Sequence, residues 1–380
     1  MQKGHARAGI AKELNLVDRP RHGLRVLYLA TDAYGGHGGI ALFSRNLIEA
    51  LDADDRVAEI VCPPRIADGE IGPLPAKLTY DLSGLSGRGA YLRAVLRHVL
   101  TGRFDAVIVP HINLAPVAWA AAKLSRARWA LCLHGIDAWP AAATPRRRLF
   151  GLRADAIVSV SALTLGRFRS WCPVDPARCV VIPNAMDFAG YAPGPRDPAL
   201  EARYGLAGKR VILTLGRLDP AERYKGFDEI IELLPELAPD ITYLIAGKGD
   251  DRARLEAKAA ALGVADRVVF AGMVPEAEKV ATYRLADVYA MPSTGEGFGF
   301  VFLEAMACGI PAIASDLDGG REAVREGKLG QVVDPADRAG LKAAVLRALD
   351  QPKGVPEGLD YFGLPAYRQR ISDLLTRLVK

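Results

Sequence analysis

The chain has 380 residues, of which 50% are hydrophobic and 24% are charged, and its formal net charge is +5. This length is typical of two medium-sized domains, and the composition excludes a disordered or fibrous protein. No apolar run approaches the roughly 20 residues of a membrane-spanning helix, and residues 1–23 lack the apolar region of a signal peptide. We therefore expect a cytoplasmic protein.

Short apolar runs rich in β-branched residues alternate with segments of helical periodicity along the whole chain. In the first half, the expected strands are residues 24–30, 57–62, 106–109, 129–133, 156–160 and 180–182. In the second half, they are residues 211–215, 242–246, 268–271, 288–291, 312–314 and 330–333. Helical segments between them include residues 40–51, 227–237, 250–262 and 336–349. This alternation predicts an α/β protein with doubly wound parallel sheets that helices cover on both faces.

A break in the periodic pattern falls at residues 185–198, which are rich in Pro, Gly and Ala. We therefore expect Rossmann-like domains at residues 1–188 and 189–363, and an amphipathic helix over 364–380 that packs back towards the first domain. Ligands of open parallel sheets bind at the carboxyl ends of the strands. Two such sheets facing each other predict a central cleft, with functional residues placed directly after strands.

The first half carries an excess of basic residues and the second a slight excess of acidic ones. The basic residues include a helix-like stretch at 91–103 and the cluster Arg146, Arg147 and Arg148. A basic face with interleaved apolar residues fits either a solvated helix surface or contact with an anionic membrane. The inner face of the plasma membrane is therefore a second expected location beside the cytoplasm.

Residues 292–311 combine a glycine-rich turn with the start of a helix, directly after an apolar strand. Glycines in the turn let the backbone approach a ligand, and the N–H groups at a helix start suit a diphosphate. Glu296 stands in the turn and Glu304 lies about one helical turn inside the helix, so we expect both to reach the same pocket. A carboxylate is a poor phosphate ligand but a good acceptor for sugar hydroxyls. The alternative is a structural turn in which Glu296 favours the helix dipole.

The stretch EGFGFVFLEAMACGIP resembles the E-x7-E signature of the family 4 glycosyltransferases, with Glu296 and Glu304 as its two glutamates. GRLDPAERYKG, VVIPNAMD, YLIAGKGD, VVFAGMV and LHG are similar to further motifs of this family and run in its order across nearly the whole chain. Two departures are Ala185, where the family usually has glycine, and a longer spacing between Arg217 and Lys225. The resemblance implies the GT-B fold and a transferase that retains the anomeric configuration.

The resemblance also implies a role for each matching residue. Glu296 would hold the transferred sugar, Glu304 would bind the ribose, and Arg217 and Lys225 would grip the diphosphate. His134 would reach the sugar and phosphate from the first domain. The remaining donor contacts would come from Gly38, Gly39, Gly247, Val274 and the backbone amides of Phe298 and Gly299.

Chemistry supports the cationic pair independently, because charge accumulates on the leaving diphosphate as the glycosidic bond breaks. Mg²⁺ could neutralise this charge, but Arg217 and Lys225 together with a helix dipole would also serve. Two Asp-x-Asp patterns, typical of metal-dependent transferases, occur at 52–54 and 316–318. We interpret the first as the end of a helix and the second as part of a loop. Glu322, which follows the second pattern, would lie near the acceptor or act as a structural cap. We predict no metal and no cofactor, and no chemical role for the five cysteines.

Other functions remain open at this stage. An NAD-dependent oxidoreductase is disfavoured because residues 35–39 do not continue into G-x-G-x-x-G. His134 has the alternative of a buried core histidine. A nucleotide-sugar epimerase or phosphorylase, and a noncatalytic partner subunit that binds nucleotide sugar, would share the fold. The favoured function is α-linked transfer of a hexose from a UDP- or GDP-sugar to a saccharide or lipid-linked acceptor in exopolysaccharide, lipopolysaccharide or glycolipid assembly. No nucleic-acid partner is expected.

Overall fold

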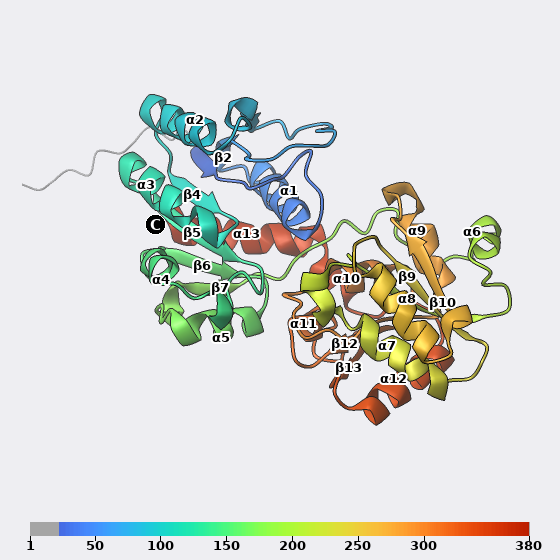
Figure 1. The fold of residues 1–380 in the computed structure, drawn as a ribbon. Coiled ribbons are helices and arrows are strands. Elements are labelled where there is room, and N and C mark those ends of the chain that lie inside the picture. The colour runs from blue at the N-terminus through green and yellow to red at the C-terminus, as the bar shows by residue number, and fades with distance from the viewer. Residues whose placement is uncertain (1–22, 380) are drawn as a thin grey trace, which may run out of the picture.

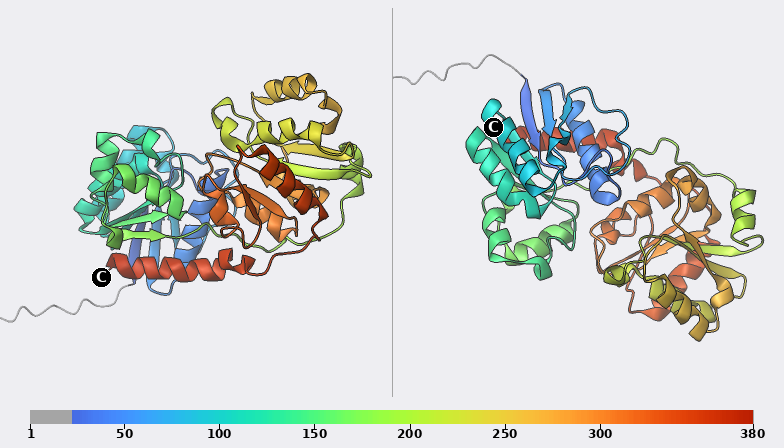
Figure 2. Two further views of the ribbon diagram at one scale, coloured as in Figure 1. Left: turned by 90° about the horizontal axis from the view of Figure 1, so that it is seen from below. Right: turned by 45° about the horizontal axis from the view of Figure 1, so that its top comes forward.

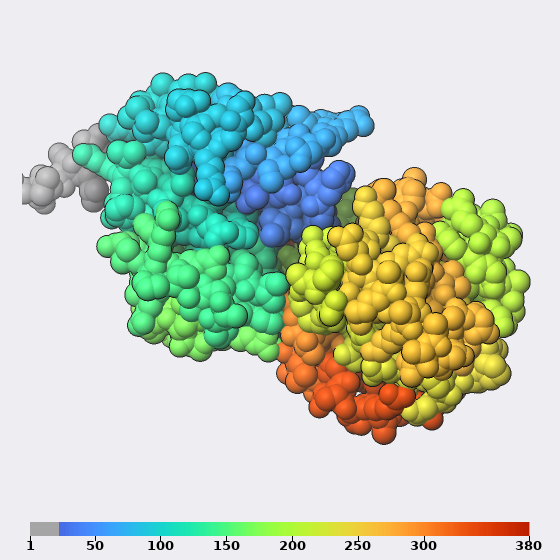
Figure 3. Space-filling view, viewed as in Figure 1, coloured from blue at the N-terminus to red at the C-terminus, as the bar shows by residue number. Residues whose placement is uncertain are grey.

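The computed structural model describes residues 23–379, which form two lobes, each a parallel sheet with helices packed against it (Figure 1). The space-filling view shows the lobes as separate bodies that meet along one side (Figure 3). Within residues 23–379 no helix has the length and apolar character needed to cross a bilayer.

The first lobe contains a seven-stranded parallel sheet in the order β3-β2-β1-β4-β5-β6-β7. Its strands are β1 (Leu24–Tyr28), β2 (Val57–Cys62), β3 (Leu78–Tyr80), β4 (Ala106–Val109), β5 (Arg128–Leu133), β6 (Ala156–Ser159) and β7 (Cys179–Val181). The sequence pattern predicted six of them and missed β3. This edge strand has only three residues and is half exposed, so it lacks the apolar run that marks a central strand.

The chain between the strands of the first sheet forms the helices α1 (Gly39–Asp52), α2 (Arg88–Thr101), α3 (Ala115–Ser125), α4 (Pro145–Gly151) and α5 (Ala162–Trp171). Side-chain caps begin two of them, since Thr144 accepts from the backbone of Arg147 and Ser161 from that of Thr164. Helix α1 begins differently, at Gly38, whose φ of 87° suits glycine and which offers no side-chain cap. The first backbone N–H groups of α1 are therefore open to a ligand.

The second lobe contains a six-stranded parallel sheet in the order β10-β9-β8-β11-β12-β13. Its strands are β8 (Arg210–Leu215), β9 (Ile241–Ala246), β10 (Val268–Gly272), β11 (Val288–Met291), β12 (Ala312–Ser315) and β13 (Gln331–Val333). Its helices are α6 (Pro198–Arg203), α7 (Phe227–Leu233), α8 (Arg252–Ala261), α9 (Glu276–Leu285), α10 (Phe300–Ala307), α11 (Gly320–Ala323) and α12 (Arg338–Asp350). All six predicted strands are present. Helix α7 ends before the predicted residue 237 because Pro235 cannot donate the next helical hydrogen bond.

The last helix, α13 (Leu364–Val379), returns to the first lobe and packs on α1, β4 and β5 (Figure 2). Its buried face is Tyr367, Ile371, Leu374, Leu375 and Leu378. The two chain crossings between the lobes lie side by side, because the N–H of Met186 donates to the carbonyl of Phe362 at 2.9 Å and Met186 pairs with Gly363 in a β-bridge. The first lobe is thus built from both ends of the described chain.

Candidate active site

The glycine-rich turn between β11 and α10 is the centre of the candidate site. Helix α10 begins at Gly299, whose φ is 91° and which provides no side-chain cap. Among the described residues, no acceptor lies within hydrogen-bonding distance of the backbone N–H of Phe298 or Gly299. The Phe298 side chain is buried against Phe362, so only its backbone can reach a ligand. These features leave N–H groups at the start of α10 open to a ligand, as an anion site would require.

The two lobes touch at this turn, where strand ends from both sheets meet. A Cβ atom at Gly297 would lie 1.6 Å from the carbonyl oxygen of His134, and one at Gly135 would lie 2.9 Å from Gly297 Cα. A Cβ at Gly39 would meet the ring of Phe300 at 3.7 Å. Only glycine permits the first two approaches. The N-terminal end of α1 is therefore next to the N-terminal end of α10, as the predicted diphosphate site requires.

The predicted cationic pair lies beside this turn, in one cluster with Glu296. Lys225 Nζ is 3.4 Å from Glu296 Oε2 and 3.6 Å from Glu222 Oε2, and Arg217 forms an ion pair with Glu222. Glu222 was not singled out from the sequence, although it lies inside the quoted motif GRLDPAERYKG. The spacing of opposite charges in that motif is the signal that could have identified it. The structure therefore brings together three predicted residues and one unpredicted carboxylate.

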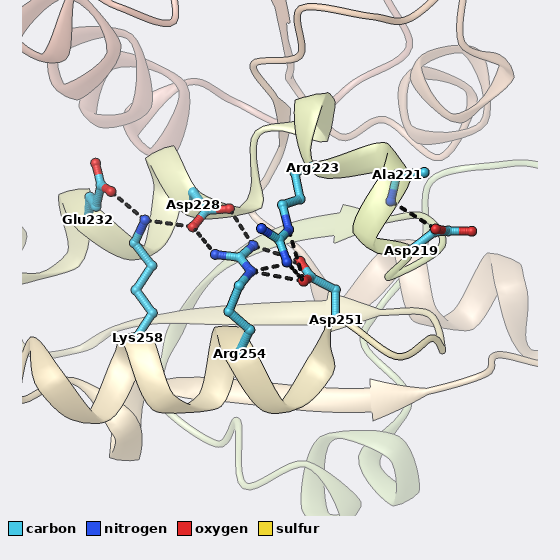
Figure 4. A network of polar contacts seen from close by, with 8 residues as sticks. All are labelled: Asp219, Ala221, Arg223, Asp228, Glu232, Asp251, Arg254 and Lys258. Atoms are coloured by element: carbon cyan, nitrogen blue, oxygen red, sulfur yellow. Dashed lines mark hydrogen bonds and ion pairs between the residues drawn. The ribbon is translucent and has the colours of Figure 1, made fainter.

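A larger polar network holds the 3-10 segment η5 (Pro220–Lys225) that carries this cluster (Figure 4). Arg254 donates to both carboxylate oxygens of Asp228, at 2.6 and 2.7 Å, and also to Asp251. Asp251 in turn accepts from Arg223, two residues before Lys225. Although burial alone would raise it, hydrogen bonds from Arg254 and Lys258 lower the pKa of Asp228 to about 2. The network ties η5 and α7 to α8 and so fixes the backbone that presents the cations.

Glu304 lies apart from this cluster. Its side chain is buried, accepting from the Tyr283 hydroxyl at 2.6 Å and from Lys279 at 3.1 Å, both on α9. The sequence placed Glu296 and Glu304 in one pocket, but the structure joins only Glu296 to the cationic pair. Val274, half-buried, directly precedes α9. Glu304 and Val274 therefore border the same helix, and their predicted contacts with ribose and base stay predictions.

His134 follows β5 and its ring contacts Phe43, with centroids 4.6 Å apart. Burial lowers its pKa to about 4, so the imidazole is neutral at physiological pH. Its Nε2 lies 2.5 Å from the carbonyl oxygen of Pro110, which can only accept, so Nε2 carries the proton. Nδ1 is then an acceptor. His134 can receive a hydrogen bond from a hydroxyl through Nδ1, while its one ring proton is engaged by the carbonyl of Pro110.

Gly247 has a structural reason for being glycine. Its φ is 152°, and a Cβ there would lie 1.8 Å from the carbonyl oxygen of Gly216. The turn after β9 therefore packs against the backbone that leads into Arg217. Its predicted contact with the donor stays a prediction.

Three of the four aspartates in the Asp-x-Asp patterns accept hydrogen bonds within residues 23–379, and Asp316 is the exception. Asp52 accepts from the backbone of Lys77, and Asp54 binds Arg56. Asp318 is fully buried and accepts three hydrogen bonds, from the Ser293 hydroxyl and two backbone N–H groups. Of the two alternatives for Glu322, the structure contains the cap: its carboxylate accepts from the first backbone N–H groups of α5. The sequence did not indicate which helix it would cap.

A cavity of about 390 Å³ opens in the first lobe between α2, α3 and α4. Four arginines line it together with apolar side chains, namely Arg65, Arg88, Arg146 and Arg147. None of them forms an ion pair with a carboxylate within residues 23–379. Helix α2 continues from its rim with a row of exposed leucines, Leu92, Leu96 and Leu100. The cavity therefore combines uncompensated positive charge with an adjoining apolar strip.

Comparison with known proteins decides the family. Residues 198–361 match the model described as glycosyl transferases group 1, and residues 38–185 match that of a glycosyl transferase 4-like domain. The chain is 37% identical over 273 residues to the GDP-mannose-dependent alpha-(1-6)-phosphatidylinositol monomannoside mannosyltransferase of Mycolicibacterium smegmatis, covering 67% of this chain and 70% of the relative. The chain belongs to the family 4 glycosyltransferases.

A second relative supports the same family. This glycosyltransferase is 31% identical over 364 residues to the D-inositol 3-phosphate glycosyltransferase of Geodermatophilus obscurus, with 83% of this chain and 78% of that one covered.

Solved structures support the GT-B fold. An Anabaena protein crystallised with UDP and glucose superposes with a TM-score of 0.73 at 21% identity, covering 93% of this chain and all of that one. Sucrose-phosphate synthase from Thermosynechococcus elongatus gives a TM-score of 0.75 at 21% identity, covering 93% and 99%. The predicted fold, two Rossmann-like parallel-sheet domains, is confirmed.

Proposed function

We propose that this glycosyltransferase moves a hexose from a nucleotide-diphosphate sugar to an acceptor hydroxyl, with retention at the anomeric carbon and without a metal ion. The observation that carries the proposal is the cluster of Arg217, Lys225 and Glu296 beside the open amides of Phe298 and Gly299. Cations and amides suit a diphosphate, and the carboxylate suits the sugar attached to it.

The chemistry follows from where charge develops. As the bond from the anomeric carbon to the phosphate oxygen breaks, negative charge grows on the diphosphate, where Arg217, Lys225 and the two helix N-termini would stabilise it. The acceptor hydroxyl would attack from the same face and give its proton to the departing phosphate oxygen. Glu296 is held by Lys225 and serves to position the sugar. The neutral His134 would orient a hydroxyl through Nδ1.

The acceptor side favours an anionic molecule. The four arginines around the first-lobe cavity would bind a phosphate group, because guanidinium groups match phosphate oxygens in pairs. Both relatives are named for phosphorylated inositol compounds, one of them a glycolipid. We therefore propose a phosphate-bearing polyol or glycolipid as acceptor.

The surface beside the first-lobe cavity also supports contact with a membrane. The leucines of the α2 strip, Leu92, Leu96 and Leu100, are 49%, 47% and 70% exposed and lie between exposed arginines. Such a strip can enter the headgroup region while its arginines attract anionic lipid. We propose that α2 rests on the membrane when the acceptor is a lipid.

The test is product formation from GDP-mannose, UDP-glucose and UDP-galactose, with phosphatidylinositol vesicles or soluble inositol phosphate as acceptor, followed by mass spectrometry. GDP-mannose is the first choice because a relative's name specifies it. Replacing a stabilising cation typically costs about 10²-fold or more in turnover, so Lys225→Ala and Arg217→Ala should show such losses. Lys209→Ala, an exposed lysine outside the cluster, is the control.

Near-normal turnover in both cation variants would exclude the assignment. Donor incubated alone distinguishes an epimerase, and donor with inorganic phosphate distinguishes a phosphorylase. Donor binding without any turnover would indicate a noncatalytic subunit. Activity should persist in EDTA, and its loss with recovery on adding Mg²⁺ would overturn the metal-free mechanism.

A further inference from the structure

The segment that runs from the end of β12 into α11, residues 316–322, holds Glu296 by its backbone. The Asp318 carboxylate accepts from the N–H of Glu296 at 2.7 Å and from the Ser293 hydroxyl at 2.6 Å. In return, the N–H of Gly319 donates to the carbonyl of Glu296 at 2.8 Å. A Cβ at Gly319 would lie 2.0 Å from the carbonyl oxygen of Gly297, so the two loops are in direct contact. Both backbone groups of Glu296 are therefore fixed by this one segment.

The same segment also docks on the other lobe. Glu322 accepts from the backbone N–H groups of Ala162 and Leu163, at 2.7 and 2.9 Å, which are the first two residues of α5. Arg167, also on α5, donates to the carbonyl of Leu317 at 2.8 Å. A carboxylate at the N-terminus of a helix is favoured by the helix dipole as well as by its hydrogen bonds. Within this segment, the first-lobe anchors and the Glu296 anchors are only a few residues apart.

We infer that residues 316–322 couple docking of the two lobes to the placement of Glu296, with Glu322 and Asp318 as positioning residues. When Glu322 is bound to α5, the segment is anchored at both ends, and the Glu296 carboxylate is held beside Lys225. When the lobes separate, the segment loses its first-lobe anchor. A donor can then bind to the second lobe while its sugar is not held for transfer. This inference rests on the proposed function, because it assigns Glu296 to the donor sugar.

This coupling has a chemical consequence. A nucleotide sugar bound in an open site is exposed to water. Water can then replace the acceptor, so that the donor is hydrolysed without transfer. Linking the position of Glu296 to lobe docking confines sugar activation to the closed form.

The test is Glu322→Gln, which keeps the side-chain shape but can accept with only one of its two terminal atoms, so one α5 N–H group loses its partner. The matched control is Glu326→Gln, four residues on, which is exposed and pairs with Arg321. We expect Glu322→Gln to lower kcat by about tenfold, as the loss of one charge-assisted bond would do. The affinity for nucleoside diphosphate should stay within about twofold of wild type, since those contacts lie in the second lobe.

Solution X-ray scattering with bound UDP or GDP provides a readout that does not depend on turnover. We expect a larger radius of gyration for Glu322→Gln than for wild type or Glu326→Gln. An unchanged kcat and radius would overturn the coupling, as would a loss of nucleotide affinity equal to the loss of kcat. Should the wild type turn over no donor, the proposed function fails while scattering still tests the docking. If Glu322→Gln does not fold, Arg167→Ala removes the second anchor and takes its place, with Arg169→Ala, which bonds only within the first lobe, as its control.

Discussion

The two cations of the candidate diphosphate site, Arg217 and Lys225, both pair with one carboxylate, Glu222. A diphosphate bound at the proposed site would compete with Glu222 for Arg217 and Lys225. Repulsion between the carboxylate and the incoming phosphates adds to this competition. We therefore expect Glu222 to lower the affinity of the protein for a diphosphate.

Glu222→Gln should therefore bind GDP or UDP more tightly, by about threefold to tenfold, since tenfold corresponds to about 1.4 kcal/mol. Isothermal titration calorimetry measures this directly. The control is Glu236→Gln, an exposed glutamate that pairs with Arg338 in another part of the lobe. Weaker nucleotide binding by Glu222→Gln would mean that this carboxylate organises the cations instead of competing for them.

Because the pKa of His134 is lowered in the fold, we expect the stability of the protein to depend on pH. Its folded-state pKa is about 4, below the value of about 6.5 expected in the unfolded chain. The unfolded state therefore binds more protons between these values, and the stability present above pH 6.5 is lost as the pH falls towards 4. Because His134 keeps some exposure, we expect the loss to be about 1–3 kcal/mol.

Urea unfolding at pH 7.5 and pH 5 measures this contribution when wild type is compared with His134→Asn. The variant should lose less stability than wild type between the two pH values. Equal losses would show that the environment of His134 does not favour the neutral ring.

For individual residues, the sequence indicated which side chains belong to the candidate site better than it indicated which residues they contact. Arg217 follows β8, Lys225 lies just before α7 and Glu296 lies in the turn after β11, so all three belong to connections that leave the carboxyl ends of parallel strands. Glu222 was overlooked although its partners Arg217 and Lys225 lie within its own motif. The role of Asp318 could not be predicted, because its partners come from the turn after β11 and meet it only in the fold. The contacts of Glu304 with α9 leave no mark in its own motif, and its predicted contact with the ribose stays a prediction.

Among the elements, η5 depends most on support from its neighbours. It is a short 3-10 segment with no buried side chain, so its position comes from the network around Arg254 (Figure 4). Removing Arg254 would leave Asp228 and Asp251 without their main partner in a partly buried place.

Arg254→Ala should lower the free energy of unfolding by about 1–3 kcal/mol and weaken diphosphate binding as well, because η5 carries Lys225. Arg252→Ala is a close control, since Arg252 lies two residues away on α8 and makes an exposed pair with Glu256 worth about 0.5 kcal/mol or less. Urea unfolding and calorimetry measure the two effects. If both variants lose the same stability, the network does not hold η5.

Element types were predictable wherever the apolar pattern was long. The four inner strands of the second sheet, β9, β8, β11 and β12, are largely buried on both faces, so each reads as an apolar run. Failures came at short or interrupted elements, such as the three-residue β3 and the end of α7 at Pro235. Short segments carry too few residues for a period to be visible.

For the whole molecule, α13 links the end of the described chain to the first lobe. Its buried side chains contact α1 and the first sheet, although the segment before it belongs to the second lobe. The first lobe therefore cannot complete its core without the end of the chain.

Leu374→Ala should destabilise the protein by about 2–5 kcal/mol, the usual cost of truncating a fully buried leucine. Leu346→Ala on α12 is the control, because that side chain is 37% exposed and should lose much less. Thermal unfolding measures the difference. A loss for Leu374→Ala no larger than the control's would mean that α13 is not part of the first-lobe core.

The two-lobe organisation and the return of the last helix were predictable from alternation, the interdomain break and amphipathic spacing. The contacts between lobes were not. They rest on glycines that allow a close approach, as at Gly135 and Gly297, and on Glu322 capping a helix of the other lobe. Neither pairing has a periodic signature, because each joins residues more than 150 positions apart.

The central claim is that a sugar passes from a diphosphate to an acceptor hydroxyl with its configuration kept. It is tested most directly by NMR with a donor labelled with carbon-13 at the anomeric carbon, in the presence of EDTA. We predict that the label moves to an α-linked product while one nucleoside diphosphate is released for each bond formed. A β-linked product, or a label that stays on the nucleotide or leaves as sugar phosphate, would contradict the account.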